Sequence, residues 1–219
     1  MSENRTDCIA IDGPAASGKS TIGRVLASRF GYSFLDTGLM YRAFTLAALR
    51  RKVPPTDEAC ARFAKALSLT LGDEPEAHIY IDGEDVTALL HDREIERNVS
   101  SYARLDPVRA QMRKQQRDYA ARGHTVLAGR DIGQVVVPDA ALKFYLEADE
   151  AARARRRNTE RGIVHEDHAR ESHKELSRRD QLDSPQTYIA PDAIVIDTSE
   201  LTLDEVVARV LEQVACANA

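Results

Sequence analysis

The residues best suited to chemistry form an eight-residue stretch near the N-terminus. Residues 13–20 read Gly-Pro-Ala-Ala-Ser-Gly-Lys-Ser, a complete G-x-x-x-x-G-K-[ST] pattern. In such a loop the backbone N–H groups converge on a phosphate, the lysine reaches the β- and γ-phosphates of a nucleotide, and the last hydroxyl binds Mg²⁺. The residues predicted to bind the nucleotide are Gly13, Pro14, Ala15, Ala16, Ser17, Gly18, Lys19, Ser20 and Thr21, with Ser20 as the metal ligand.

The surroundings of this loop argue against a chance glycine-rich turn. The apolar residues 8–11 precede it, and residues 19–30 follow it with apolar side chains at helical spacing, up to a terminating Gly31. A phosphate loop needs this strand–loop–helix context, because the helix N-terminus adds a dipole that favours anions. The sequence therefore predicts a protein that binds a nucleoside triphosphate.

Arginines follow two further apolar segments and form a dense cluster later in the chain. Arg42 comes shortly after residues 32–35, and Arg130 comes soon after residues 125–128. The cluster itself consists of Arg153, Arg155, Arg156, Arg157 and Arg161. Arginine is planar, always charged and able to bind one phosphate through two N–H groups. We therefore expect a second phosphate-bearing molecule beside the triphosphate, with catalysis by positioning and charge.

Five short apolar segments are predicted to form the parallel sheet that positions these loops. They span residues 8–11, 32–35, 125–128, 142–146 and 193–196, and helical patterns separate them. The apolar runs alternate little with polar residues, as expected of α/β strands covered by helices on both faces. In such folds ligands bind at the carboxyl ends of the strands, where the arginine-bearing loops begin.

Residues 56–122 break this alternation. They are predicted to form an insertion in a core made of residues 1–55 and 123–219. Within the insertion, residues 68–90 alternate around a turn at 72–75, which predicts a small antiparallel hairpin. Two helices are expected to complete the insertion, at 92–103 and 106–122.

Several helix starts can be predicted from capping residues. Thr37 is the expected cap of the helix after the second strand, and Asp106 is the expected cap of the helix that begins with Pro107. Thr202 and Glu205 have the spacing of a capping box, which predicts a last helix from Thr202 with an apolar stripe against the sheet.

Composition limits the classes of function. The chain has 219 residues, of which 43% are hydrophobic, and a formal net charge of −5. The negative balance disfavours a nucleic-acid-binding protein, and no apolar run is long enough to predict a membrane span. The three cysteines lack metal-ligand spacing and residues 1–7 lack an apolar signal region, so we expect a cytoplasmic protein. No obligate protein partner is implied.

Motifs along the chain resemble those of the bacterial cytidylate kinase family. Their order and spacing match over residues 7–215, and they read Asp12-Gly13-Pro14, Leu35-Asp36-Thr37-Gly38 with Tyr41-Arg42, Gly129-Arg130-Asp131-Ile132-Gly133, and Arg179-Asp180 with Asp183-Ser184. The resemblance implies a P-loop kinase core with a small monophosphate-binding insertion and a helical lid at about 153–178. It implies Mg²⁺-dependent transfer of the γ-phosphoryl group of ATP to CMP or dCMP.

The resemblance also implies a role for each matching residue. The monophosphate site is expected to be lined by Thr37, Tyr41 and Arg42, with Arg42 and Arg130 at the acceptor phosphate. Those expected at the cytosine ring are Ser100, Arg109 and Asp131, and those at the sugar are Arg179 and Asp183. The expected catalytic residues are Lys19, Arg130 and the lid arginines Arg153, Arg156 and Arg157. A carboxylate beside an arginine distinguishes cytosine from uracil, because the wrong base edge leaves buried polar groups unpaired.

Simpler roles and other functions stay open. Ser100 can instead bond only to its own helix, Arg109 can lie on a solvated face, and the arginine run can pair with Asp149 and Glu150. One departure is Gln186, where the family usually has an arginine, so we expect weaker binding of the acceptor phosphate or slower lid closure. The alternative functions are a P-loop kinase for UMP, AMP or a small metabolite, and a nucleotide-dependent switch without phosphotransfer.

Overall fold

The computed structural model describes residues 6–72, 75–163 and 165–217. Residues 73 and 74, which belong to the turn predicted at 72–75, lie outside the described residues. No helix in these three ranges is both long and apolar enough to cross a membrane.

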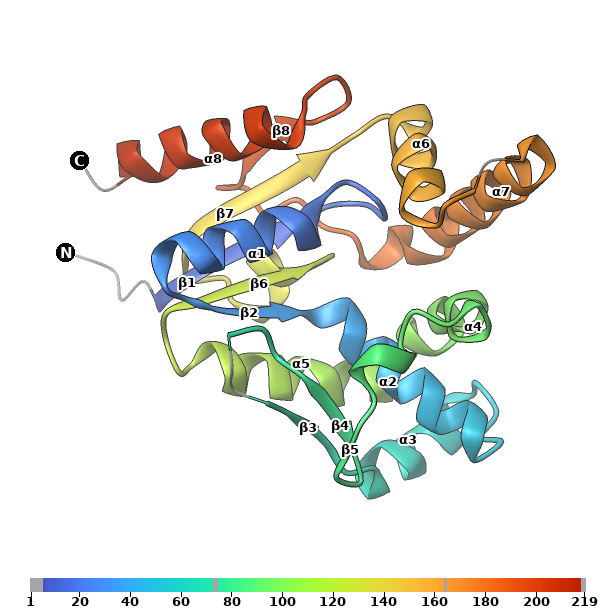
Figure 1. Cartoon of the computed structure of the whole chain (residues 1–219). Helices are drawn as coiled ribbons and strands as arrows, with labels where there is room; N and C mark the ends of the chain where they lie inside the picture. Colours follow the sequence, from blue (N-terminus) through green and yellow to red (C-terminus); the bar gives the residue numbers. More distant parts are fainter. Residues whose placement is uncertain (1–5, 73–74, 164, 218–219) are drawn as a thin grey trace.

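A central sheet of five parallel strands organises the chain (Figure 1). The strands are β1 (Thr6–Asp12), β2 (Ser33–Asp36), β6 (Thr125–Gly129), β7 (Ala140–Glu147) and β8 (Ile194–Asp197). Their order across the sheet is β2-β6-β1-β7-β8, with every neighbouring pair parallel. The predicted parallel α/β sheet is confirmed, and its central strand is the one that leads into the phosphate loop.

Helices cover both faces of this sheet, as predicted (Figure 1). One face carries α1 (Lys19–Phe30) and α8 (Leu203–Ala217), and the other carries α2 (Thr37–Arg50) and α5 (Asp106–Ala120). The first pair buries Ile22 and Val210 in one apolar core, and the second pair buries Met40 and Met112 in another.

Two helix ends follow the predicted local signals. Gly31 closes α1 with a φ of 67°, a left-handed conformation that glycine adopts without a Cβ clash. At α8 the capping box is confirmed, because Thr202 N and Glu205 Oε2 lie 2.8 Å apart while Glu205 N donates to Thr202 Oγ1.

Two other helix starts differ from the prediction. The cap of α2 is Asp36, whose carboxylate accepts the backbone N–H two residues on, and Thr37 is the first helical residue. The cap of α5 is Leu105, and Asp106 lies in the first turn with Pro107. In both cases the expected residue is displaced by one position. At Asp106 the carboxylate still lies in the first turn, where the helix dipole favours a negative charge.

Residues 56–122 form α3 (Asp57–Ala66), β3 (Leu69–Leu71), β4 (Ile79–Ile81), β5 (Glu84–Asp85), α4 (Arg93–Ala103) and α5. The three strands form an antiparallel sheet, so the expected two-stranded hairpin is extended by a third strand. This segment has no core of its own, because residues of α3, β4, α4 and α5 share one buried cluster with α2 and β6.

Two helices lie beyond the carboxyl end of β7, where the sequence predicts a lid (Figure 1). They are α6 (Glu150–Glu160) and α7 (Glu166–Asp183), which pack against each other. Helix α7 also contacts α4. The pair α6 and α7 therefore connects the carboxyl edge of the sheet to residues 56–122. The division into core, insertion and lid stays a prediction.

Candidate active site

A cavity of about 510 Å³ lies at the carboxyl ends of β1, β2 and β6. Most of the predicted site residues line it, namely Ala15, Ala16, Ser17, Gly18, Lys19, Ser20, Thr21, Thr37, Tyr41, Arg42, Ser100, Arg109, Arg130, Asp131, Arg156, Arg157, Arg179 and Asp183. The predicted residues outside this lining are Gly13, Pro14 and Arg153. One cavity therefore brings together side chains that are up to about 170 residues apart in the sequence, as the parallel topology requires.

The phosphate loop connects β1 to α1 and depends on its two glycines. Gly13 has a φ of 149°, and a Cβ there would clash with the carbonyl oxygen of Leu146 on β7. Gly18 has a φ of 96° and forms the N-cap of α1. Gly13 thus lacks room for a side chain beside β7, whereas Gly18 needs glycine because of its positive φ. The N-terminus of α1 consequently opens into the cavity, where it favours an anion.

Lys19 is folded back along this loop. Its ammonium donates to the Pro14 carbonyl at 2.6 Å and lies 3.5 Å from Ser17 Oγ. Burial, and after it the nearby positive charge of Arg130, lower the pKa of Lys19 to about 7, against the opposing effect of Asp36. The charges around Lys19 are therefore not negative enough to keep it fully protonated. A bound phosphate would supply the missing negative charge.

Ser20 and Asp36 bring two hard oxygen atoms together at the cavity wall. Ser20 Oγ donates to Asp36 Oδ2 at 2.6 Å, while Asp36 Oδ1 caps α2 by accepting from Gly38 N at 3.0 Å. Mg²⁺ is typically bound by one or two such oxygens together with waters and substrate phosphates. This pair fits that donor set, although no group of three or more His, Cys, Asp or Glu side chains among the described residues could hold a metal.

Asp12, at the end of β1, fixes the loop that follows β6. Its two carboxylate oxygens accept the backbone N–H groups of Ile132 and Gly133, each at 2.8 Å. Burial raises the pKa of Asp12 to about 6, and the two backbone donors partly oppose this shift. These two hydrogen bonds hold the turn that carries Arg130 and Asp131 against the phosphate loop.

Asp131 forms the centre of a buried charge group on the far side of the cavity. Its Oδ2 accepts from Arg109 Nη2 at 2.7 Å and from Arg113 Nη2 at 2.8 Å. The Asp131 side chain is 5% exposed, so these pairs are well shielded from water. The Arg109 guanidinium also lies over the ring of Tyr41, 5.7 Å from its centre. Arg109 thus lies in a buried pair and not on a solvated face.

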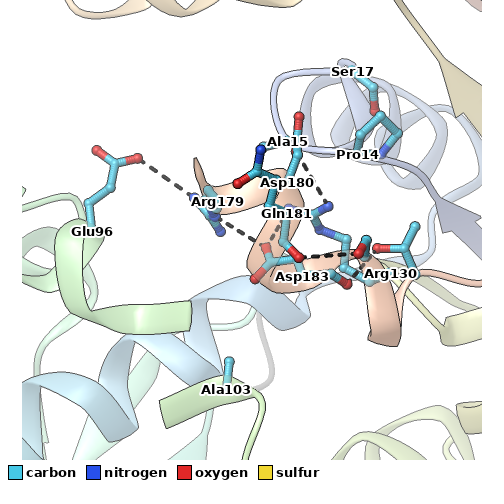
Figure 2. Close-up of polar contacts among 12 residues, drawn as sticks. Pro14, Ala15, Ser17, Glu96, Ala103, Arg130, Arg179, Asp180, Gln181 and Asp183 are labelled. Atoms are coloured by element: carbon cyan, nitrogen blue, oxygen red, sulfur yellow. Dashed lines mark hydrogen bonds and ion pairs between the residues drawn. The ribbon is translucent and has the colours of Figure 1, made fainter. Parts of the chain in front are cut away.

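A second carboxylate, Asp183 at the end of α7, links two arginines (Figure 2). Asp183 Oδ2 accepts from Arg130 Nη2 at 2.7 Å and from Arg179 Nε at 3.4 Å. Burial lowers the pKa of Arg130, and Asp183 opposes that effect. Gln186 also lines the cavity, one helical turn after Asp183.

Arg42 is buried on α2. Its Nη1 donates to the Leu90 carbonyl at 3.0 Å, and its Nη2 lies 3.4 Å from the carboxylate of Glu96 on α4. Burial lowers the pKa of Arg42 to about 10, with repulsion from Arg179 as the next cause. Such a guanidinium would be stabilised by the approach of a further anion.

The three predicted lid arginines have different partners. Arg153 pairs with Asp180, and its Nη1 lies 3.3 Å from the Ala15 carbonyl. It therefore contacts the phosphate loop without lining the cavity. Arg156 donates to Thr198 Oγ1 at 3.0 Å, after β8. Arg157 pairs with Glu96. The simpler alternative of pairs with Asp149 and Glu150 is therefore wrong for these three, since Asp149 instead caps α6 through Ala152 N.

Two predicted site residues, Thr37 and Ser100, differ in whether their side chains are already bonded. The hydroxyl of Thr37 donates to the Ala128 carbonyl at 2.8 Å and ties α2 to β6. Ser100 is buried on α4 and faces the cavity, where it can still meet a ligand.

Sequence reasoning missed four residues that shape the site: Asp36, Glu96, Arg113 and Asp180. Asp36 had the best signal, because it stands between the second strand and its helix, where a cap and a metal ligand both fit. Glu96 and Arg113 sit on amphipathic helices, and their sequence positions do not differ from those of solvated charges. Their partners lie on other elements, which only the packing reveals.

Comparison with known proteins gives a consistent family. A family model described as cytidylate kinase matches residues 9–216. The cytidylate kinase of Herpetosiphon aurantiacus is 44% identical over 214 residues, which is 93% of this chain and 92% of that protein. That of Bacillus licheniformis is 41% identical over 217 residues, 94% of each chain. The solved structure of an uncharacterized protein from Eubacterium ventriosum shares the fold, with a TM-score of 0.54 at 10% identity, covering 95% of this chain and 98% of that one.

Proposed function

The chain belongs to the cytidylate kinase family, and we propose that it transfers the γ-phosphoryl group of ATP to CMP or dCMP, giving ADP and CDP or dCDP. The observation that carries this proposal is the single cavity that holds a phosphate loop at one end and the Asp131–Arg109 pair at the other. The first end suits a triphosphate and the second suits a base with an amino donor.

The donor half of the proposal rests on the phosphate loop. The N–H groups of residues 15–18 and the N-terminus of α1 bind the β- and γ-phosphates of ATP, and Lys19 turns from Pro14 toward them. Ser20 and Asp36 would hold Mg²⁺, which would supply positive charge against the negative charge of the phosphates. Arg156 and Arg157 line the same cavity and can close over the transferred group.

The acceptor half rests on Arg42, Arg130 and the base-binding pair. Arg42 and Arg130 bind the phosphate of the monophosphate, while Arg179 and Asp183 hold its sugar. Asp131 has its Oδ2 committed to two arginines, so Oδ1 is the oxygen proposed to accept the 4-amino group of cytosine. Uracil has an oxygen there, which would face the carboxylate and leave it unpaired.

The chemistry needs no general base. The acceptor phosphate is mostly a dianion near pH 7, because its second pKa is about 6. One of its oxygens attacks the γ-phosphorus as the bond from that phosphorus to the β,γ-bridging oxygen breaks, and the electron pair stays on ADP. Lys19 and the arginines stabilise the charge that moves from one oxygen to the other, and lid closure excludes water as a competing acceptor.

An acceptor panel tests the proposal. The purified chain is assayed with ATP or GTP as donor and CMP, dCMP, UMP and AMP as acceptors, with and without Mg²⁺. We expect turnover of CMP and dCMP well above UMP and AMP, and no turnover without a divalent metal. Better turnover of AMP than of CMP would contradict the base assignment, and ATP hydrolysis independent of any monophosphate would contradict a kinase.

We also propose that the protein works in the cytoplasm with small-molecule substrates alone. The thiols of Cys8 and Cys60 are free and buried, as is usual in a reducing compartment.

A further inference from the structure

Glu96 on α4 is a nearly buried carboxylate that meets arginines from three other helices. Its side chain is 10% exposed. Its partners are Arg42 of α2, Arg157 and Arg161 of α6, and Arg179 of α7. Glu96 Oε1 lies 3.4 Å from Arg42 Nη2 and 3.6 Å from Arg179 Nη1, and Figure 2 shows it reaching toward Arg179. One carboxylate thus ties the expected acceptor-phosphate arginine to the lid.

All four guanidiniums share the Glu96 carboxylate. Each of the four guanidiniums is less than 20% exposed, and Glu96 supplies one negative charge among them. Glu175 adds a carboxylate at Arg161, Asp183 adds one at Arg179, and the exposed Glu160 adds one at Arg157. Burial and neighbouring guanidiniums still lower the pKa of Arg157 to about 10. A group of largely buried guanidiniums that share one carboxylate is suited to a phosphate, which brings more negative charge and more acceptor oxygens.

The position of Glu96 relative to the two cavities shows from which side it contacts these arginines. A second cavity, of about 480 Å³, lies beside the first, between α4 and the helices α6 and α7. Arg157 and Arg179 line both cavities, whereas Glu96 lines only the second. The carboxylate therefore binds these guanidiniums from outside the substrate cavity.

We propose that Glu96 competes with substrate phosphate for these arginines, so that acceptor binding requires its displacement and the residue sets the affinity of the site for phosphate. The inference rests on the proposed function, in which Arg42 and Arg179 meet the acceptor nucleotide. In Arg42 it is Nη2 that faces Glu96, while Nη1 donates to the Leu90 carbonyl. A phosphate that takes the Nη2 donor of Arg42 therefore replaces the contact that this nitrogen makes with Glu96.

A binding measurement tests this. Calorimetric titration of CMP and of cytidine is carried out on the wild type, Glu96→Gln and Glu94→Gln. Glu94 lies exposed on the same helix, so its substitution removes the same charge without touching the arginine group. We expect Glu96→Gln to bind CMP about tenfold more tightly, the effect of one charge-assisted hydrogen bond. Cytidine, which has no phosphate, should bind equally to all three proteins.

Glu96→Asp keeps the test valid if the glutamine variant folds poorly, because aspartate retains the charge with a shorter reach. Its CMP affinity should fall between those of the wild type and Glu96→Gln. Unchanged or weaker CMP binding by Glu96→Gln overturns the proposal, since it would make Glu96 a positioning residue. An equal gain for cytidine overturns it too. Because binding is measured without ATP, this result is separate from the turnover panel, where the proposed function stands or fails.

Discussion

Binding of ATP should draw a proton into the phosphate loop, onto Lys19. Burial and Arg130 lower the pKa of Lys19 from 10.5 to about 7. At pH 8 a group with this pKa is only about one-tenth protonated. The phosphates of ATP place several negative charges beside the ammonium and should return its pKa toward the ordinary range. We therefore expect an uptake of about 0.9 proton per ATP bound at pH 8.

Calorimetry in several buffers measures this proton directly. The observed binding enthalpy is plotted against the ionisation enthalpy of the buffer, and the slope is the number of protons taken up. The uptake should fall as the pH is lowered from 8 to 6, because Lys19 is already protonated below its pKa. Asp12 does not interfere at pH 8, since its raised pKa is about 6 and it stays ionised there.

Lys19→Arg is the matched control. Arginine stays charged throughout this pH range and still binds a phosphate, so the linked uptake should vanish while ATP binding persists. A slope near zero for the wild type at pH 8 would show that Lys19 is already charged without nucleotide. An equal slope in Lys19→Arg would assign the proton to another group, and either result refutes the reasoning.

Three further predictions concern the elements around the cavity. Arg113→Gln should lower kcat/KM for CMP about tenfold and reduce discrimination against UMP, because Asp131 loses one of its two charged partners. Lys114→Gln, on the exposed face of the same helix, should change neither value. Gly23→Ala should lower the free energy of unfolding in urea by about 1–3 kcal/mol, because its Cβ would clash with a buried aromatic ring of β2, and an unchanged value would show that the ring has room to move. Asp12→Asn should lower that free energy by about 1–3 kcal/mol at pH 7 by leaving one buried backbone N–H without an acceptor. The difference between wild type and this variant should shrink as the pH rises from 3.8 to about 6, since the raised pKa means that the folded state favours protonated Asp12.

The fold could be predicted because its signals are local. Each strand of the central sheet is a short apolar run bounded by turn residues, and each helix has its own periodic pattern. Residues 8–11 and the phosphate loop that follows them also predicted a strand joined to a helix at the carboxyl edge of the sheet. The failures were local as well: the caps of α2 and α5 lie one residue before Thr37 and Asp106.

Which residues gather at the cavity could be predicted for the same reason. Which of their charged side chains pair with one another could not. Arg42, Arg130 and Asp131 follow strands that end at one edge, so their meeting follows from the topology. Glu96 and Arg157 are 61 residues apart on two exposed-looking helices, and nothing in either helix indicates the other. Pairing of this kind depends on how the helices α4 and α6 approach each other, which no periodicity encodes.

These pairings alter how the affinity of the site should be understood. A site that gathers this many cations within one cavity would repel itself unless carboxylates lay among them, and Asp180, Asp183 and Glu96 fill that role toward Arg153, Arg130 and Arg42. A phosphate that reaches Arg130 or Arg42 therefore exchanges one anion for another and does not simply add an ion pair. The net affinity is the difference between two strong interactions, so small changes in the carboxylates should shift it as much as the loss of an arginine. The same balance bears on Gln186, because a site with internal carboxylates in competition with the substrate has less to gain from one more arginine than a count of cations suggests.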